Sequence, residues 1–271
     1  MIIKKNNKNI GPNDKVTVYE NNDKIQINYT EYRPSEFPIK KINNNYYEDK
    51  DKKIKKVNHS SKRNHKNSNY VSSKKLQTLI RFNFNGDPKN EFFITLTYKD
   101  GNYDPNQLNK DFNKFIRKLR SKNKNLGFIR INELQQNGSF HIHLLIKNIE
   151  KINKLKIQNL WPYGLINLKP IQNQIGVNKL ANYFKYAPNS ANKKKIIKAK
   201  LLEKLPTGIN LFSKSKNIKY PKIRRAEYKD IRPTLKKYDL INKNAYQIIN
   251  KNGEIVNKIK KEFYDKNNCW I

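Results

Sequence analysis

Short apolar runs separated by turn residues mark the middle of the chain. The runs at 92–98, 127–134 and 140–147 (FFITLTY, GFIRINEL and FHIHLLIK) are rich in β-branched, aromatic and aliphatic residues, and they predict three buried strands. The second and third runs are joined by QQNGS, whose turn-forming residues predict an antiparallel hairpin centred near Asn137-Gly138.

Helical spacing appears between and after these strands. Residues 105–122 repeat apolar side chains every three or four positions after the start signal Asp104-Pro105. A short helix near 150–158, a strand at 164–170 and a helix near 176–187 follow. The first six elements match the split β-α-β arrangement of ferredoxin-like domains. The predicted fold class is therefore α+β, ferredoxin-like or RRM-like, with an antiparallel sheet and helices on one side.

The two flanks are polar and basic, so the pattern predicts three regions: an N-terminal extension over 1–75, a domain over 76–200 and a C-terminal region over 201–271. In the first region, KVTVYE and KIQINYT alternate around an Asn-Asn-Asp turn and predict a hairpin. Residues 39–75 have the composition of either a nucleic-acid-contacting arm or a disordered linker. In the C-terminal region the pattern is irregular, with weak helical spacing near 240–265.

Charge is the strongest compositional feature. The chain of 271 residues has 58 Lys and Arg against 22 Asp and Glu, a formal net charge of +36. A chain this basic repels itself unless polyanions screen it, which indicates nucleic acid as a partner. Codon bias in an AT-rich genome would inflate the lysine count, so charge alone does not separate a coating protein from an enzyme.

Several classes are excluded. The single cysteine, Cys269, permits no disulfide framework and no cysteine-based zinc module. No apolar run is long enough to span a membrane, so no membrane partner is expected. None of the nine glycines is followed by lysine, so no P-loop is present.

His141 and His143 are separated by one residue within an otherwise apolar strand. Side chains alternate along a strand, so both imidazoles share one face while Ile142, Leu144 and Ile146 point into the core. Two imidazoles on one face form half of a metal site. The plainer interpretation is a pair of surface histidines on a solvated sheet face, and the motif alone does not decide between them.

Glu133 strengthens the metal interpretation. It lies near the end of the preceding strand, and a hairpin centred near Asn137-Gly138 places it close to opposite His143. Two imidazoles and one carboxylate leave coordination positions open, which suits Mg²⁺ or Mn²⁺ acting on a phosphate oxygen. The alternative is an exposed carboxylate at a strand end.

The predicted helix near 176–187 carries Tyr183, Lys185 and Tyr186. The two tyrosines are three residues apart and share roughly one helical face. A phenolate can attack a phosphodiester and retain the strand covalently, and a nearby lysine would neutralise phosphate charge. Two aromatic residues packing a helix on a sheet would give the same pattern, and the chain has 16 tyrosines.

FITLTY, GSFHIHLLI and ANYFKY, in this order and spacing, resemble the three motifs of the HUH endonucleases. The resemblance is closest to rolling-circle replication initiators of small phages and plasmids. WPYGLINLKPI (161–171) and GINLFSKSKNIKYP (208–221) also resemble that group, so the likeness covers roughly 76–221. It implies His141, His143 and Glu133 as metal ligands, Tyr183 or Tyr186 as the nucleophile, and Lys185 as a residue stabilising the phosphate.

One departure leaves the nucleophile open. Many relatives read Tyr-x-x-Lys-Tyr, and aligning Lys185-Tyr186 with that pattern puts Asn182 at the first tyrosine. That alignment needs no deletion and favours Tyr186, whereas shortening by one residue makes Tyr183 the first tyrosine. Pro188 soon afterwards limits the helix.

The resemblance implies metal-dependent nicking and rejoining of single-stranded DNA through a 5′-phosphotyrosine, at a replication origin in the cytoplasm of a bacterial host. The expected partners are single-stranded DNA, the origin duplex, and a helicase and a polymerase of the host. A transposase or relaxase would use the same site on different DNA. A non-catalytic nucleic-acid-binding protein would show neither metal dependence nor a covalent product.

Overall fold

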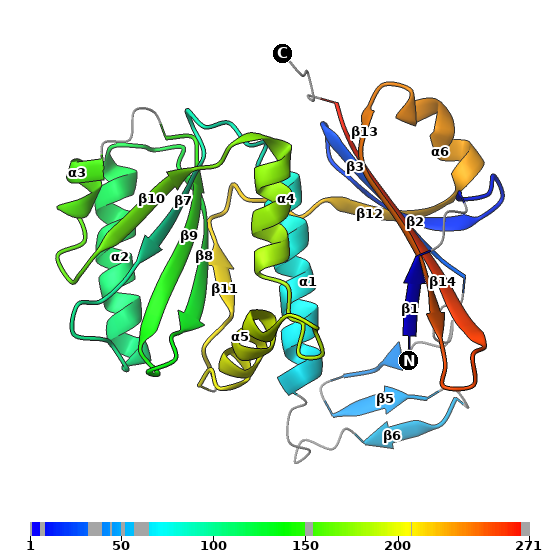
Figure 1. Ribbon diagram of the computed structural model, residues 1–271, viewed down its shortest axis with the longest axis horizontal. Coiled ribbons are helices and arrows are strands. Elements are labelled where there is room, and N and C mark those ends of the chain that lie inside the picture. Colours follow the sequence, from blue (N-terminus) through cyan, green and yellow to red (C-terminus); the bar gives the residue numbers. More distant parts are fainter. Residues whose placement is uncertain are drawn as a thin grey trace. The chain divides into compact units, whose positions relative to one another are not determined.

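The computed structural model describes residues 2–5, 9–31, 40–43, 45–49, 52–56, 65–149, 154–206 and 208–266. The chain forms two compact units (Figure 1). Residues 64–220 form one, here called the central unit. Residues 1–63 and 221–271 together form the other, here called the flank unit, so both polar flanks contribute to one body.

The central unit contains a five-stranded antiparallel sheet with the order β10-β7-β9-β8-β11. Its strands are β7 (Phe92–Leu96), β8 (Gly127–Leu134), β9 (Phe140–Lys147), β10 (Ile166–Pro170) and β11 (Phe212–Lys214). Its helices are α1 (His65–Asn83), α2 (Pro105–Ser121), α3 (Lys154–Gln158), α4 (Asn173–Tyr183) and α5 (Lys193–Glu203). The order β7-α2-β8-β9-α3-β10 is the predicted one, and the sheet is consistent with a ferredoxin-like arrangement.

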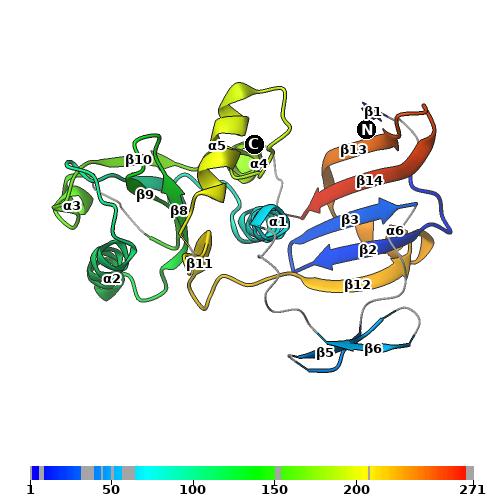
Figure 2. The same ribbon diagram turned by 90° about the horizontal axis from the view of Figure 1, so that it is seen from below.

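Helices cover both faces of this sheet, whereas the sequence pattern predicted helices on one side. Helices α2 and α3 pack on the face that carries Ile142, Leu144 and Ile146. Helices α1 and α4 pack on the opposite face, against Ile131 and Leu145 (Figure 2). The prediction missed the second layer because α1 lies in the polar stretch assigned to the N-terminal extension, where only its last turns are apolar.

Local signals explain the elements that were predicted correctly. At the start of α2, the Asp104 side chain accepts a hydrogen bond from the Asn106 amide, and Pro105 occupies the first turn. The β8–β9 turn is closed by Gln135 N donating to Ser139 O at 2.8 Å. Gly138 has φ of 84°, the left-handed conformation that such a three-residue loop requires.

The flank unit contains a six-stranded antiparallel sheet with the order β1-β13-β14-β3-β2-β12. Its strands are β1 (Ile2–Lys5), β2 (Lys15–Glu20), β3 (Lys24–Thr30), β12 (Lys222–Glu227), β13 (Asp239–Ile249) and β14 (Ile255–Asp265). Helix α6 (Tyr228–Leu235) packs through Ile231 and Leu235 on one face, against Val18 and Ile27. The predicted β2–β3 hairpin is confirmed, whereas the weak helical pattern near 240–265 is wrong because β13 and β14 occupy that segment.

Residues 39–75 were left open between an arm and a linker. Three short strands, β4 (Lys40–Lys41), β5 (Tyr46–Glu48) and β6 (Ile54–Lys56), form a small antiparallel sheet there, and α1 begins at His65. Residues 32–39, 44, 50–51 and 57–64 lie outside the described part of the chain. Among the helices that the structure describes, none is long and apolar enough to cross a lipid bilayer.

We expect Phe115→Ala to lower the free energy of unfolding by about 3–5 kcal/mol. Phe115 is fully buried, and its ring meets Trp161 edge-on at 5.9 Å between centroids, so its removal leaves a cavity. Urea unfolding followed by tryptophan fluorescence measures the change. Leu165→Ala is the control, because this side chain is 74% exposed. Equal stability of the two variants would contradict the assignment of the core.

Candidate functional site

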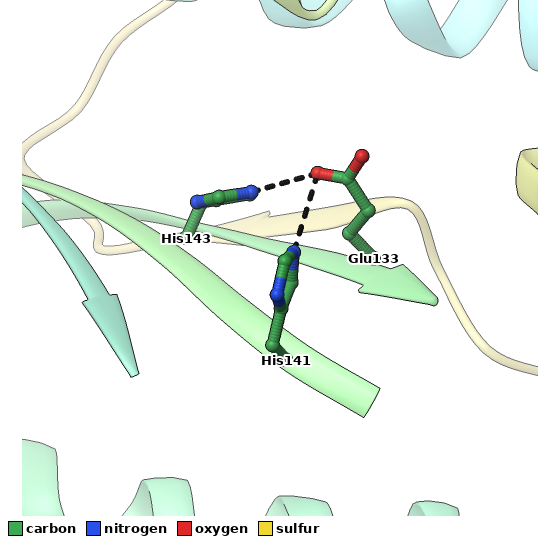
Figure 3. A group of neighbouring side chains, drawn as sticks. All are labelled: Glu133, His141 and His143. Atoms are coloured by element: carbon green, nitrogen blue, oxygen red, sulfur yellow. Dashed lines mark ion pairs between the residues drawn. The ribbon is translucent and has the colours of Figure 1, made fainter. Parts of the chain in front are cut away.

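Glu133, His141 and His143 lie on neighbouring strands and on the same face of the central sheet, the one covered by α1 and α4 (Figure 3). The register pairs Glu133 with His141 and Ile131 with His143. The sequence placed Glu133 close to opposite His143, so that expectation is off by one pair on the same face. The cause is the turn, in which three residues separate the paired Gln135 and Ser139.

The Glu133 side chain reaches across to both imidazoles. Its Oε2 lies 2.7 Å from His143 Nε2 and 3.6 Å from His141 Nε2. One ligand atom from each of the three residues lies within 4.8 Å of the others. These atoms are buried and make no hydrogen bond of normal geometry within the described part of the chain. Three converging buried donors of this kind fit a divalent cation, and the cluster could hold a metal ion.

The protonation states also suit a metal. Burial alone would raise the pKa of Glu133, but the contacts with His141, His143 and Lys198 outweigh it and hold this pKa well below its usual range. Burial lowers the pKa of His143 to about 4, against the attraction of Glu133. At neutral pH the site therefore offers an ionised carboxylate and a neutral imidazole, the forms that bind metal.

Two residues of β7 fix the His143 ring. Thr95 Oγ1 lies 3.1 Å from His143 Nδ1, and Phe93 stacks on the ring with 5.3 Å between centroids and an interplanar angle of 19°. A proton on Nδ1 donated to Thr95 leaves the lone pair of Nε2 directed at Glu133. Neither residue was singled out from the sequence, because only the strand pairing brings them to the histidine.

Tyr183 lies beside the cluster as the last residue of α4. Its ring meets that of His143 edge-on at 5.8 Å between centroids, and the residue is 48% exposed. Burial of part of the ring and the charge of Glu133 raise its pKa to about 12. The phenol is thus protonated at neutral pH and accessible to solvent next to the three candidate ligands.

Lys198 on α5 is a site residue that the sequence analysis missed. Its Nζ lies 3.1 Å from Glu133 Oε1 and 3.2 Å from the centroid of the Tyr183 ring. Burial lowers its pKa to about 8, against the attraction of Glu133. No local signal distinguishes it among the many basic residues of the chain, and α5 itself was not predicted.

Tyr186 and Lys185 lie beyond the end of α4, which was predicted to continue to 187. The Tyr186 side chain is 6% exposed, and its hydroxyl donates to Glu203 of α5. Its amide donates to Ser73 Oγ of α1 at 2.8 Å. Lys185 is exposed, and its amide donates to Asn182 O at 3.2 Å.

The comparison with protein families bears on this same part of the chain. Residues 91–189 match a family model of replication-associated proteins of the ORF2 type. The matched segment contains Glu133, both histidines and Tyr183, and it supports a role in the initiation of replication. It covers neither α1 nor α5. No curated protein and no solved structure matches the chain.

We expect Thr95→Val to weaken Mn²⁺ binding by about 10-fold, because the substitution removes the oxygen that orients His143. Isothermal titration calorimetry measures the affinity. Thr97→Val is the matched control, because it lies two residues further along the chain and its hydroxyl donates to Leu165 O instead. Equal Mn²⁺ affinity of the two variants would contradict the orienting role of Thr95.

Proposed function

We propose that this protein initiates rolling-circle replication by nicking and rejoining single-stranded DNA through a tyrosine in a metal-dependent reaction. The observation that carries the proposal is the contact of Tyr183 with His143, which joins a candidate nucleophile to the Glu133–His141–His143 cluster. The match of residues 91–189 to a replication-associated family supports the same reaction class.

His141, His143 and Glu133 would hold Mg²⁺ or Mn²⁺. A divalent ion bound there supplies Lewis-acid polarisation of a phosphate oxygen and partial neutralisation of its charge. Thr95 and Phe93 hold the His143 ring in its orientation. The three ligands come from one rigid hairpin, which favours a preorganised site over one assembled from mobile loops.

In the proposed reaction the Tyr183 oxygen attacks phosphorus in line. The tyrosyl O–P bond forms as the P–O3′ bond breaks, so the 5′ side remains on the enzyme as a phosphotyrosine and the 3′ side leaves as a free hydroxyl. The phenolic proton passes to solvent, and the 3′ oxygen takes up a proton on leaving. Rejoining reverses these bond changes when a 3′-hydroxyl attacks the phosphotyrosine.

Tyr183 is our choice of nucleophile over Tyr186. Tyr186 is buried, and its hydroxyl is engaged by Glu203, whose charge, after burial itself, helps to raise its pKa to about 12. A buried phenol held by a carboxylate is poorly placed to reach a phosphodiester. Tyr183 is half-exposed and touches the candidate metal ligands. Lys185, which the motif resemblance suggested, has its side chain in solvent.

The net charge of +36 would hold the substrate. Single-stranded DNA and the origin duplex are the proposed partners, and their affinity should fall steeply as salt rises, because binding releases counterions. We further propose that a helicase and a polymerase of the bacterial host unwind the duplex and extend the free 3′ end.

We expect Tyr183→Phe to abolish the covalent DNA adduct, because the attacking oxygen is missing. Incubation with a random single-stranded oligonucleotide library and Mn²⁺, followed by denaturing gel electrophoresis and mass spectrometry, detects the adduct. Tyr186→Phe is the matched control and should retain it. Attachment of DNA to Tyr186 would overturn the choice of nucleophile. Absence of any adduct in the unmodified protein, with DNA binding intact, would favour a non-catalytic binder.

We expect Lys198→Ala to slow cleavage by about 100-fold, because the substitution removes a positive charge that would stabilise the phosphate in the transition state. Single-turnover cleavage with saturating DNA measures the rate. Lys200→Ala removes the same charge from an exposed position of the same helix, and it should cleave at nearly the normal rate. Similar rates for both variants would show that Lys198 acts only through net charge.

A further inference from the structure

The flank unit contains a polar cavity of about 240 Å³ that the nicking reaction does not use. It is bounded by α6, by strands β13 and β14, and by the segment that precedes β2. Its polar lining consists of Asn9, Tyr228, Arg232, Lys243, Glu262 and Tyr264. Pockets for drug-sized ligands measure about 300–1,000 Å³, so this cavity suits a smaller group with one or two rings.

A buried carboxylate forms part of the cavity wall. Glu262 is 3% exposed, and its Oε2 accepts hydrogen bonds from Tyr228 at 2.9 Å and from Tyr264 at 2.8 Å. Its Oε1 lies 3.7 Å from Lys243 Nζ, beyond hydrogen-bond distance. The two tyrosines therefore hold one carboxylate oxygen in place and leave the other able to accept a further hydrogen bond.

The cations at this cavity do not neutralise Glu262 closely. Lys243 donates to Asn9 Oδ1. Arg232 lies on the exposed side of α6, at the edge of the cavity. The same side of the sheet is apolar beneath the rest of α6, at Val18 and Ile27. A buried carboxylate is costly where apolar side chains would pack, which favours a ligand-binding role over a purely structural one.

We infer that this cavity binds an unpaired nucleobase that carries an exocyclic amine. Glu262 Oε1 accepts a hydrogen bond from that amine, as carboxylates do at the amine of cytosine. The rings of Tyr228 and Tyr264 offer aromatic surface to the base, and Arg232 and Lys243 offer positive charge to the phosphate. The inference rests on the proposed function for the source of the base, which is single-stranded DNA.

The first test uses the full chain and four free nucleotides, the 5′-monophosphates of deoxyadenosine, deoxycytidine, deoxyguanosine and thymidine. Thymine is the base without an exocyclic amine. Isothermal titration calorimetry should show at least one amine-bearing nucleotide binding about 5- to 150-fold more tightly than thymidine monophosphate. Equal affinity for all four, or no binding, would overturn the inference.

Glu262→Gln tests the chemistry, because an amide can donate a hydrogen bond to a thymine carbonyl as well as accept one. The preference against thymidine monophosphate should disappear or reverse. A purely structural Glu262 would lower all affinities together and leave their ratio unchanged, which would count against the inference. Circular dichroism checks that this variant folds.

Arg232→Ala keeps the test independent of buried substitutions, because this residue is exposed. Nucleotide affinity should fall several-fold. Arg225→Ala on β12 removes the same charge from another exposed position and serves as the control. Equal affinities of these two variants would contradict a phosphate contact at the cavity edge.

The source of the base is tested with twelve-residue homopolymers. Single-stranded oligodeoxycytidine or oligodeoxyadenosine should bind more tightly than oligothymidine, and Glu262→Gln should remove that difference. Discrimination among free nucleotides without discrimination among homopolymers would assign the cavity to a free nucleotide and overturn DNA as the source. Tyr183→Phe and His141→Ala should leave every one of these ratios unchanged, so failure of the nicking proposal is distinguishable from failure of this one.

Discussion

His141 and His143 form a candidate metal centre only because β9 keeps its register against β8. Side chains alternate along a strand, so a slip of one residue would turn both histidines into the core and bring Ile142 and Leu144 to the opposite face. The apolar side of β9 is fully buried under α2, and this burial opposes such a slip. The hydrophobic core on one side of the sheet thus determines which chemistry the other side presents.

The helices on the candidate site's side of the sheet come largely from outside the family match. Helix α1 precedes residues 91–189 and α5 follows them, yet α5 supplies Lys198 and Glu203. Ser73 of α1 links Phe184 O, to which it donates, and Tyr186 N, from which it accepts. These contacts fix the chain just after Tyr183. The matched segment carries the candidate ligands, and its neighbours in the sequence set the environment of the tyrosines.

The sequence predicted the elements whose signals are local. Strands β8 and β9 and helix α2 combine strong apolar periodicity with turn or capping residues, so their bounds agree with the structure within a residue. Helix α1 and strands β13 and β14 are stabilised by partners far away in the sequence, and their own patterns are mostly polar. The same reason separates the candidate site residues: the histidine pair and Glu133 follow from strand geometry, whereas Lys198 and the burial of Tyr186 depend on how α5 packs.

The flank unit is discontinuous in sequence: β1 pairs with β13, β3 with β14 and β2 with β12. Its sheet therefore cannot close until β13 and β14 have left the ribosome, whereas residues 64–220 can fold during synthesis. Translation would release a chain whose central unit is already folded while β2 and β3 still wait for their neighbours. Shortening the chain at either end would leave unpaired strand edges in the same sheet, and such edges promote aggregation.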